Sequence, residues 1–103
     1  MGNILLKPSV KPRSLLLMAA VSNVARSLPH DVYITSGNDS AHMVGSKHYT
    51  NEAVDIRSKN FPSAQAKRLF ISDVLLRLGT GYDMILEGEG TVNEHFHLEH
   101  DPR

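Results

Sequence analysis

The chain has 103 residues, of which 41% are hydrophobic, and its 11 basic and 11 acidic side chains cancel to a formal net charge of zero. This length suits one domain, expected over residues 1–103, and the balanced charge argues against nucleic acid or an anionic membrane as a partner. The absence of cysteine excludes disulfides, cysteine-bound zinc and thiol catalysis, whereas six histidines are many for so short a chain. We therefore regard the histidines as candidate metal ligands.

Hydrophobic periodicity and turn residues predict two helices and four strands. Ser14 can cap the first helix and Pro29 ends it, while Pro62-Ser63 opens the second helix and Gly79 is its C-cap. In chain order we expect an extended segment at 3–12, a helix from 14 to about 27, strands at 31–35 and 53–57, a helix at 64–78, and strands at 82–87 and 95–99. This mixture, with no crossover connections between strands, indicates an α+β domain in which a largely antiparallel sheet packs on the two helices.

No apolar run in the sequence is long enough for a membrane span, which needs roughly 18 residues. Residues 15–21 follow three basic residues, as in a signal peptide, but their apolar pattern continues with helical spacing to Leu28. We therefore interpret this stretch as a core helix, and we expect neither a standard signal peptide nor a membrane span.

Two predicted strands carry metal-binding side chains on one face. Because side chains alternate along a strand, Asp55 points away from the apolar residues on either side of it, and so do His95 and His97. If the apolar faces pack on the helices, the carboxylate and these imidazoles share the outer face. His48 lies in the loop that leads into the strand of Asp55 and can fold back over it. Two neutral imidazoles and one carboxylate, with a fourth position open to water, are a catalytic zinc arrangement.

The segment from Ser46 to Asp55 resembles the Ser-x-His-x-x-Gly-x-Ala-x-Asp signature of zinc D-Ala-D-Ala metallopeptidases. Those enzymes share a fold and a metal site with lysostaphin-type endopeptidases and the hedgehog signalling domain. The segment Glu94-His95-Phe96-His97 is similar to their second motif, in which an acidic residue precedes the last zinc ligand by three positions. The resemblance extends over about residues 31–99 and implies a domain of the hedgehog/DD-peptidase type.

The resemblance implies that His48, Asp55 and His97 bind Zn²⁺. It also implies that Glu94 is the catalytic base and that His95 stabilises the developing oxyanion or places the substrate. In a regular strand Glu94 points away from both histidines, so it can be the base only from the turn before the strand. Otherwise His95 is the geometric alternative.

The sequence departs from the family pattern at two places. Asn51 replaces a glycine, which is a mild change because asparagine tolerates positive φ. Asp39 lies in a turn where relatives often carry a substrate-binding arginine, and it cannot hold a carboxylate. Either Arg57 or Lys47 takes over that contact, or the substrate binds differently, or catalysis has been lost. Ser46 and Arg57 are the candidate substrate-binding residues.

Two further side chains have weaker patterns. His42 partly mimics the first motif, but Tyr49 lies where the aspartate ligand should be, so His42 is not expected to bind metal. Glu99 shares the predicted face of His97, where it either orients that histidine from behind or remains a solvated carboxylate.

These features predict a zinc peptidase that acts on peptidoglycan stem peptides, as a D-Ala-D-Ala carboxypeptidase or an endopeptidase. The small size favours a monomeric phage lysis or tail-associated enzyme, made in the cytoplasm and acting on the cell wall after lysis or from a phage particle. The alternative is a non-catalytic, zinc-stabilised binding module of the same fold. Asp39 favours the module, whereas Glu94, which a module does not need, favours the enzyme. A third reading has no metal.

Overall fold

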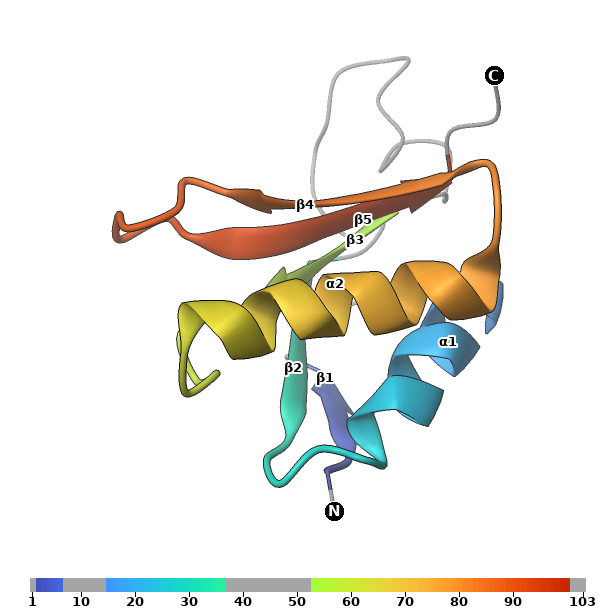
Figure 1. Ribbon diagram of the computed structural model, residues 1–103, viewed down its shortest axis with the longest axis horizontal. Coiled ribbons are helices and arrows are strands. Elements are labelled where there is room, and N and C mark those ends of the chain that lie inside the picture. The colour runs from blue at the N-terminus through green and yellow to red at the C-terminus, as the bar shows by residue number, and fades with distance from the viewer. Residues whose placement is uncertain (1, 7–14, 37–52, 101–103) are drawn as a thin grey trace.

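A computed structural model describes residues 2–6, 15–36 and 53–100 of the protein, and within them the chain forms two helices and one five-stranded sheet (Figure 1). The elements are β1 (Ile4–Leu6), α1 (Leu15–Ala25), β2 (Val32–Ser36), β3 (Ala53–Arg57), α2 (Ala64–Leu78), β4 (Tyr82–Glu87) and β5 (His95–His100). The predicted α+β class is confirmed. Neither described helix is long and apolar enough to cross a membrane.

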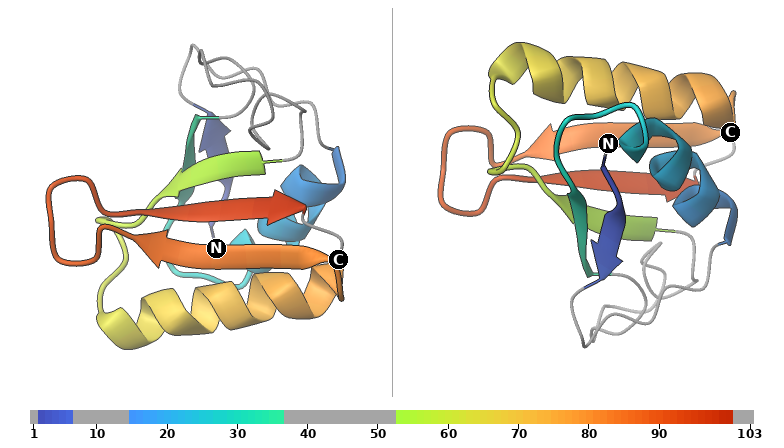
Figure 2. Two further views of the ribbon diagram at one scale, coloured as in Figure 1. Left: turned by 90° about the horizontal axis from the view of Figure 1, so that it is seen from above. Right: turned by 90° about the horizontal axis from the view of Figure 1, so that it is seen from below.

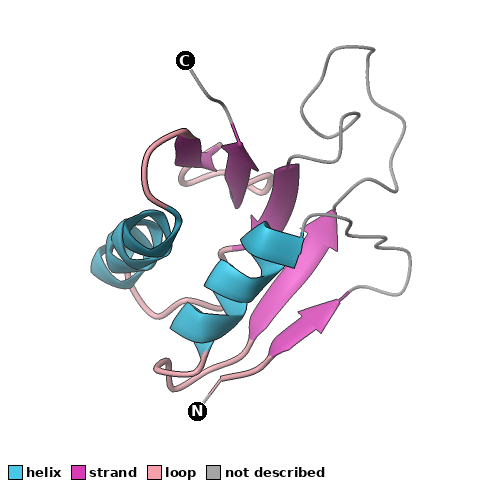
Figure 3. Ribbon diagram, turned by 90° about the vertical axis from the view of Figure 1, so that its right-hand side faces the viewer, coloured by secondary structure: helices cyan, strands magenta, loops and turns pink. Residues whose placement is uncertain are grey.

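The five described strands lie in the order β1-β2-β3-β5-β4, so that β4 is at one edge and β1 at the other. β1 pairs with β2 in parallel, and the other three pairings are antiparallel. The pairing places Asp55 directly across from His97 and Glu87 directly across from His95. The sheet is strongly twisted, as its view from the side shows (Figure 3).

The two helices cover the same face of the sheet (Figure 2). The side chains that β3 and β5 direct towards them are at most 1% exposed, namely Val54, Ile56, Phe96 and Leu98. Phe96 meets Phe61 and Phe70, with all three ring centroids 4.9 to 5.0 Å from one another. Each such side chain stabilises the fold by roughly 1.5–3 kcal/mol through burial, and each aromatic pair adds about 0.5–1.5 kcal/mol.

The second helix has well-formed ends. The Ser63 hydroxyl accepts a hydrogen bond from the Ala66 backbone N–H, which satisfies one of the free donors of the first turn. Gly79 ends the helix with a φ of 81°, a value that glycine adopts without steric cost, and its N–H donates to the Leu75 carbonyl. α2 is thereby fixed in length and register under β4 and β5.

The first strand lies within residues 3–12, which were predicted to be extended, but its pairing with β2 was not predicted. Ile4–Leu6 forms a three-residue strand, because the Asn3 carbonyl accepts the Val32 N–H and the pairing with β2 continues from there. Residues 7–12 lie outside the described part. The first helix ends at Ala25 rather than about residue 27, although Leu28 N–H still donates to the Ala25 carbonyl.

Candidate metal centre

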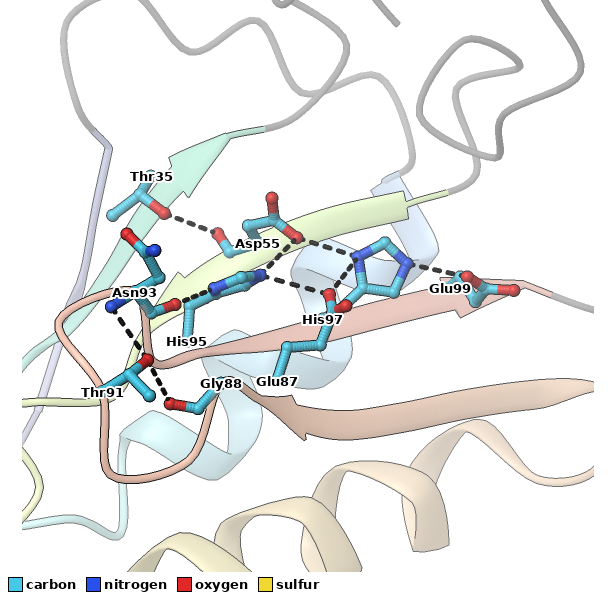
Figure 4. A network of polar contacts seen from close by, with 9 residues as sticks. All are labelled: Thr35, Asp55, Glu87, Gly88, Thr91, Asn93, His95, His97 and Glu99. Carbon is cyan, nitrogen blue, oxygen red and sulfur yellow. Dashed lines mark hydrogen bonds and ion pairs between the residues drawn. The ribbon is translucent and has the colours of Figure 1, made fainter. Parts of the chain in front are cut away.

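Asp55 on β3 and His97 on β5 form a contacting pair on the face of the sheet opposite the helices (Figure 4). Asp55 Oδ1 lies 2.9 Å from His97 Nδ1, and the two side chains are only 20% and 16% exposed. Alternation along both strands explains this placement, since the apolar neighbours of each residue are buried against the helices. The structure thus brings together two of the three predicted ligands.

Glu99 holds the other side of the His97 ring. Its Oε1 lies 2.7 Å from His97 Nε2, so both ring nitrogens face carboxylate oxygens, which can only accept. The hydrogen bond to Asp55 is the largest cause that raises the pKa of His97 to about 9; burial opposes the rise and Glu99 adds to it. His97 is therefore an imidazolium at neutral pH in the metal-free protein, and a metal at Nδ1 would replace a proton.

His95 lies beside this pair and is itself held at both nitrogens. Its Nδ1 donates to the Asn93 carbonyl over 2.6 Å, and its Nε2 lies 3.2 Å from Glu87 Oε1 and 4.0 Å from Asp55 Oδ1. The carbonyl fixes the ring so that Nε2 points towards the Asp55–His97 pair. The predicted shared face of Asp55, His95 and His97 is present in the structure.

Glu87 is a site residue that the sequence reasoning missed. It is the last residue of β4, its Oε1 lies 3.8 Å from His97 Nδ1, and its side chain is 45% exposed. The signal that could have found it is the hairpin: pairing β4 with β5 across the Gly-rich loop puts residue 87 opposite His95.

Glu94 lies in the turn immediately before β5, as its predicted role requires, but its side chain is directed to the helix face. Its carboxylate accepts hydrogen bonds from Lys67 Nζ at 2.6 Å, Ser58 Oγ at 2.5 Å and the Gly90 N–H at 3.1 Å. Lys67 first, then Ser58 and Gly90, lower the pKa of Glu94 to about 2. In this conformation the carboxylate is engaged on the helix face, and its role as the catalytic base stays a prediction.

The remaining predicted residues divide into two groups. Arg57 belongs to the same strand face as Asp55, lies across from His95, and its guanidinium carbon is 5.7 Å from the centroid of the Tyr33 ring. The others lie outside the described residues, namely Asp39, His42, Ser46, Lys47, His48 and Asn51.

The described residues fit part of a zinc site. Two neighbouring ligand atoms on a tetrahedral zinc ion are roughly 3.3 Å apart for zinc–ligand distances of about 2.0–2.1 Å. The 2.9 Å between Asp55 Oδ1 and His97 Nδ1 is near this value, and Glu99 has the position of a carboxylate that orients a ligand histidine. Within residues 2–6, 15–36 and 53–100, no group of three histidine or acidic side chains is arranged to hold a metal ion. A third ligand would have to come from the rest of the chain.

Comparison with protein-family models gave no match, and neither did comparison with curated proteins or with solved structures.

Proposed function

We propose that the protein is a zinc-dependent peptidase of the hedgehog/DD-peptidase-like fold that hydrolyses peptide bonds of peptidoglycan stem peptides. The observation that carries this proposal is the Asp55–His97 pair, backed by Glu99, on the sheet face that the helices leave open. The motif from Ser46 to Asp55 supports the same reading, because it supplies His48 as a third ligand from the segment that leads into β3.

In this proposal His48, Asp55 and His97 hold the zinc ion. Bound zinc would lower the pKa of a water molecule towards neutrality and polarise the carbonyl of the scissile bond. His95 Nε2 lies on the open face, 4.0 Å from Asp55 Oδ1 and 3.2 Å from Glu87 Oε1, and a developing oxyanion would take the place of the Glu87 carboxylate as the acceptor of its hydrogen bond. Arg57 on the same face offers a cation for the carboxylate of a stem peptide, and Ser46 is a further candidate contact.

A second candidate is the non-catalytic, zinc-stabilised binding module of the same fold. The observation in its favour is the surroundings of Glu94. Its carboxylate is bound to Lys67, Ser58 and Gly90 and is only 7% exposed, as for a group that stabilises the fold. The module and the peptidase both hold zinc, so hydrolysis has to separate them.

Metal analysis and digestion of cell walls test the proposal together. Purified protein should contain about one zinc per chain, and mass spectrometry of digested peptidoglycan should reveal new amino and carboxyl termini within stem peptides. His48→Ala and His97→Ala should each abolish both results. Protein that holds zinc firmly but cleaves no wall chemotype would be the binding module, and full zinc occupancy in His97→Ala would refute the ligand assignment.

A further inference from the structure

We infer that Tyr33 on β2 positions the guanidinium of Arg57 on β3, and that this pair recognises the free C-terminal carboxylate of a peptide. The inference deepens the proposed peptidase function and rests on it, because it makes the chain a carboxypeptidase rather than an endopeptidase. The guanidinium carbon of Arg57 lies over the Tyr33 ring, 5.7 Å from its centroid. A cation in this position is attracted by the electron-rich face of the ring.

Strand pairing brings the two side chains together. The antiparallel β2–β3 pair sets Ile34 across from Ile56, and the next position sets Tyr33 across from Arg57 on the open face. Cross-strand neighbours of this kind have Cβ atoms about 4.5–5.5 Å apart. On the other side of Tyr33, Leu5 is next to it in the parallel β1–β2 register. The half-buried ring is thus flanked on both sides, and the exposed arginine is the side chain that it can orient.

The charges of the open face leave one place for a carboxylate. Arg57 is the only arginine or lysine in the five described strands. The acidic side chains of these strands all share its face, namely Asp55, Asp83, Glu87 and Glu99. His97 is already held between two carboxylates, whereas no ion pair among the described residues involves Arg57. A carboxylate from outside is therefore repelled along β4 and β5 and attracted at Arg57.

The distance from the Asp55–His97 pair suits a terminal residue. Arg57 lies two residues beyond Asp55 on the same face of β3, which is about 6.6 Å along the strand. One residue of an extended peptide spans about 3.5 Å, and a side chain that leans along the strand covers the remainder. A peptide bond at the Asp55–His97 pair would then have its terminal carboxylate within reach of the guanidinium. The planar fork of arginine binds a carboxylate through two parallel hydrogen bonds, which an internal amide cannot accept.

Two peptides that differ only at their end test the inference: N-acetyl-D-alanyl-D-alanine and its C-terminal amide. The first measurement follows the Nε–H signal of Arg57 in heteronuclear NMR spectra of the full chain, which Arg57→Lys identifies by its loss. Each peptide, and acetate at the same concentration, is titrated in turn. This measurement needs neither metal nor turnover. The second measurement gives kcat and KM for hydrolysis of both peptides by the zinc-loaded protein.

In the wild type, the Arg57 signal should shift with the acid and much less with the amide or acetate. KM should be at least about 10-fold lower for the acid, and Arg57→Gln should remove this preference. Tyr33→Leu should raise the KM of the acid about 3-fold, as expected for loss of an exposed cation–π contact, and should leave kcat and the KM of the amide unchanged.

Two further variants separate positioning from a structural role. Tyr33→Phe keeps the ring and should match the wild type, and it still tests the inference if Tyr33→Leu folds poorly. Tyr82→Leu makes the same change on β4, at the other side of the sheet, and should keep the wild-type preference for the acid.

Equal KM values for acid and amide in the wild type would overturn the inference, and so would an unchanged preference in folded Arg57→Gln. An equal shift with acetate would reduce the pair to a general anion site. A rise in KM for both peptides in Tyr33→Leu would show that the ring supports the strand instead of the guanidinium. In all these cases a wild type that cleaves stem peptides leaves the peptidase proposal standing. If zinc-loaded wild type cleaves nothing, the peptidase proposal fails, while an acid-specific NMR shift would still support the carboxylate site.

Discussion

Glu87 and Glu94 stand at the two ends of the same hairpin loop but lie on opposite faces of the sheet. On the helix-covered face, the Glu94 carboxylate accepts hydrogen bonds from an ammonium, a hydroxyl and a backbone N–H. On the open face, Glu87 has histidine neighbours and is nearly half exposed. The Glu94 carboxylate is buried among three donors, whereas the Glu87 carboxylate stays accessible while it contacts His95 and His97. The comparison teaches that two carboxylates at the ends of one loop receive very different surroundings from the two faces of the sheet.

The largest effect should come from removing His97, which is central to the open face. His97→Ala is expected to weaken zinc binding at least about 100-fold, because each ligand contributes a substantial share of the metal's binding energy. Competition against a chromophoric chelator measures this. His30→Ala is the control, since it removes an edge contact with Phe61 and a hydrogen bond to the Asp31 carbonyl and should keep zinc. Equal zinc affinity in the two variants would show that the open face is not a metal centre.

The side chains on the helix-covered face of the sheet mainly stabilise the fold. Phe70→Ala should lower the free energy of unfolding by about 3–5 kcal/mol, because the ring is 1% exposed and contacts two other aromatic rings. Ile85→Ala, on β4 and 52% exposed, should cost much less. Urea denaturation of both variants makes the comparison. Similar losses would contradict the division of roles between the faces.

Removing the Glu99 carboxylate should have an intermediate effect on the affinity for zinc. Glu99→Gln is expected to lower zinc affinity about 10-fold, since Glu99 fixes the orientation of the His97 ring through Nε2. Isothermal titration with zinc at a fixed pH tests it, with Glu89→Gln as the control of equal charge change. An unchanged affinity would mean that the Glu99 contact forms only without metal.

The smallest predicted effect concerns the pH dependence of stability on the covered face. The pKa of Glu94 is lowered from 4.5 to about 2, so its stabilising effect is present above pH 4.5 and is lost as the pH falls through about 2. Lys67→Met should therefore melt several degrees below wild type at neutral pH. This difference in melting temperature should become smaller as the pH falls from 4.5 to 2, because Glu94 then becomes protonated in the wild type as well. Thermal melts over this range provide the measurement.

Arg68→Met on the same helix removes an equal charge from an exposed position and is the control. The melting temperature of Arg68→Met should be close to that of the wild type at neutral pH. The small difference between them should stay constant as the pH falls below 4.5. Parallel behaviour of the two variants would show that the general charge of the protein, not the Lys67–Glu94 contact, governs the pH dependence.

Much of the fold was predictable because the local signals agreed with the tertiary structure. Ser63 and Gly79 marked the ends of α2, and the alternation around Asp55 and His97 gave both the strands and their faces correctly. The short β1 was missed because three residues carry no usable period, and its strand character depends on pairing with Val32–Ser36. Periodicity describes one segment at a time and contains no information about such partners.

The candidate site also has features that were predictable from the sequence and features that were not. The sharing of one face by Asp55, His95 and His97 follows from alternation alone. The approach of Glu87 depends on the register of β4 against β5, and the engagement of Glu94 depends on where α2 places Lys67. Both are long-range outcomes of packing. The motif gave the position of Glu94 in the turn but not the direction of its side chain.

The spacing of the site residues along the chain has a consequence for folding kinetics. The Glu87–His95 contact closes a separation of 8 residues, whereas the Asp55–His97 contact closes one of 42. The entropic cost of closing the longer loop is greater by about 1.5 kcal/mol, because this cost grows with the logarithm of loop length. The hairpin contacts are therefore expected to form early, and the docking of β3 with Asp55 later. A metal ion that requires Asp55 would thus bind only after this late step, and the rate of metal uptake during refolding would report when the central strand docks.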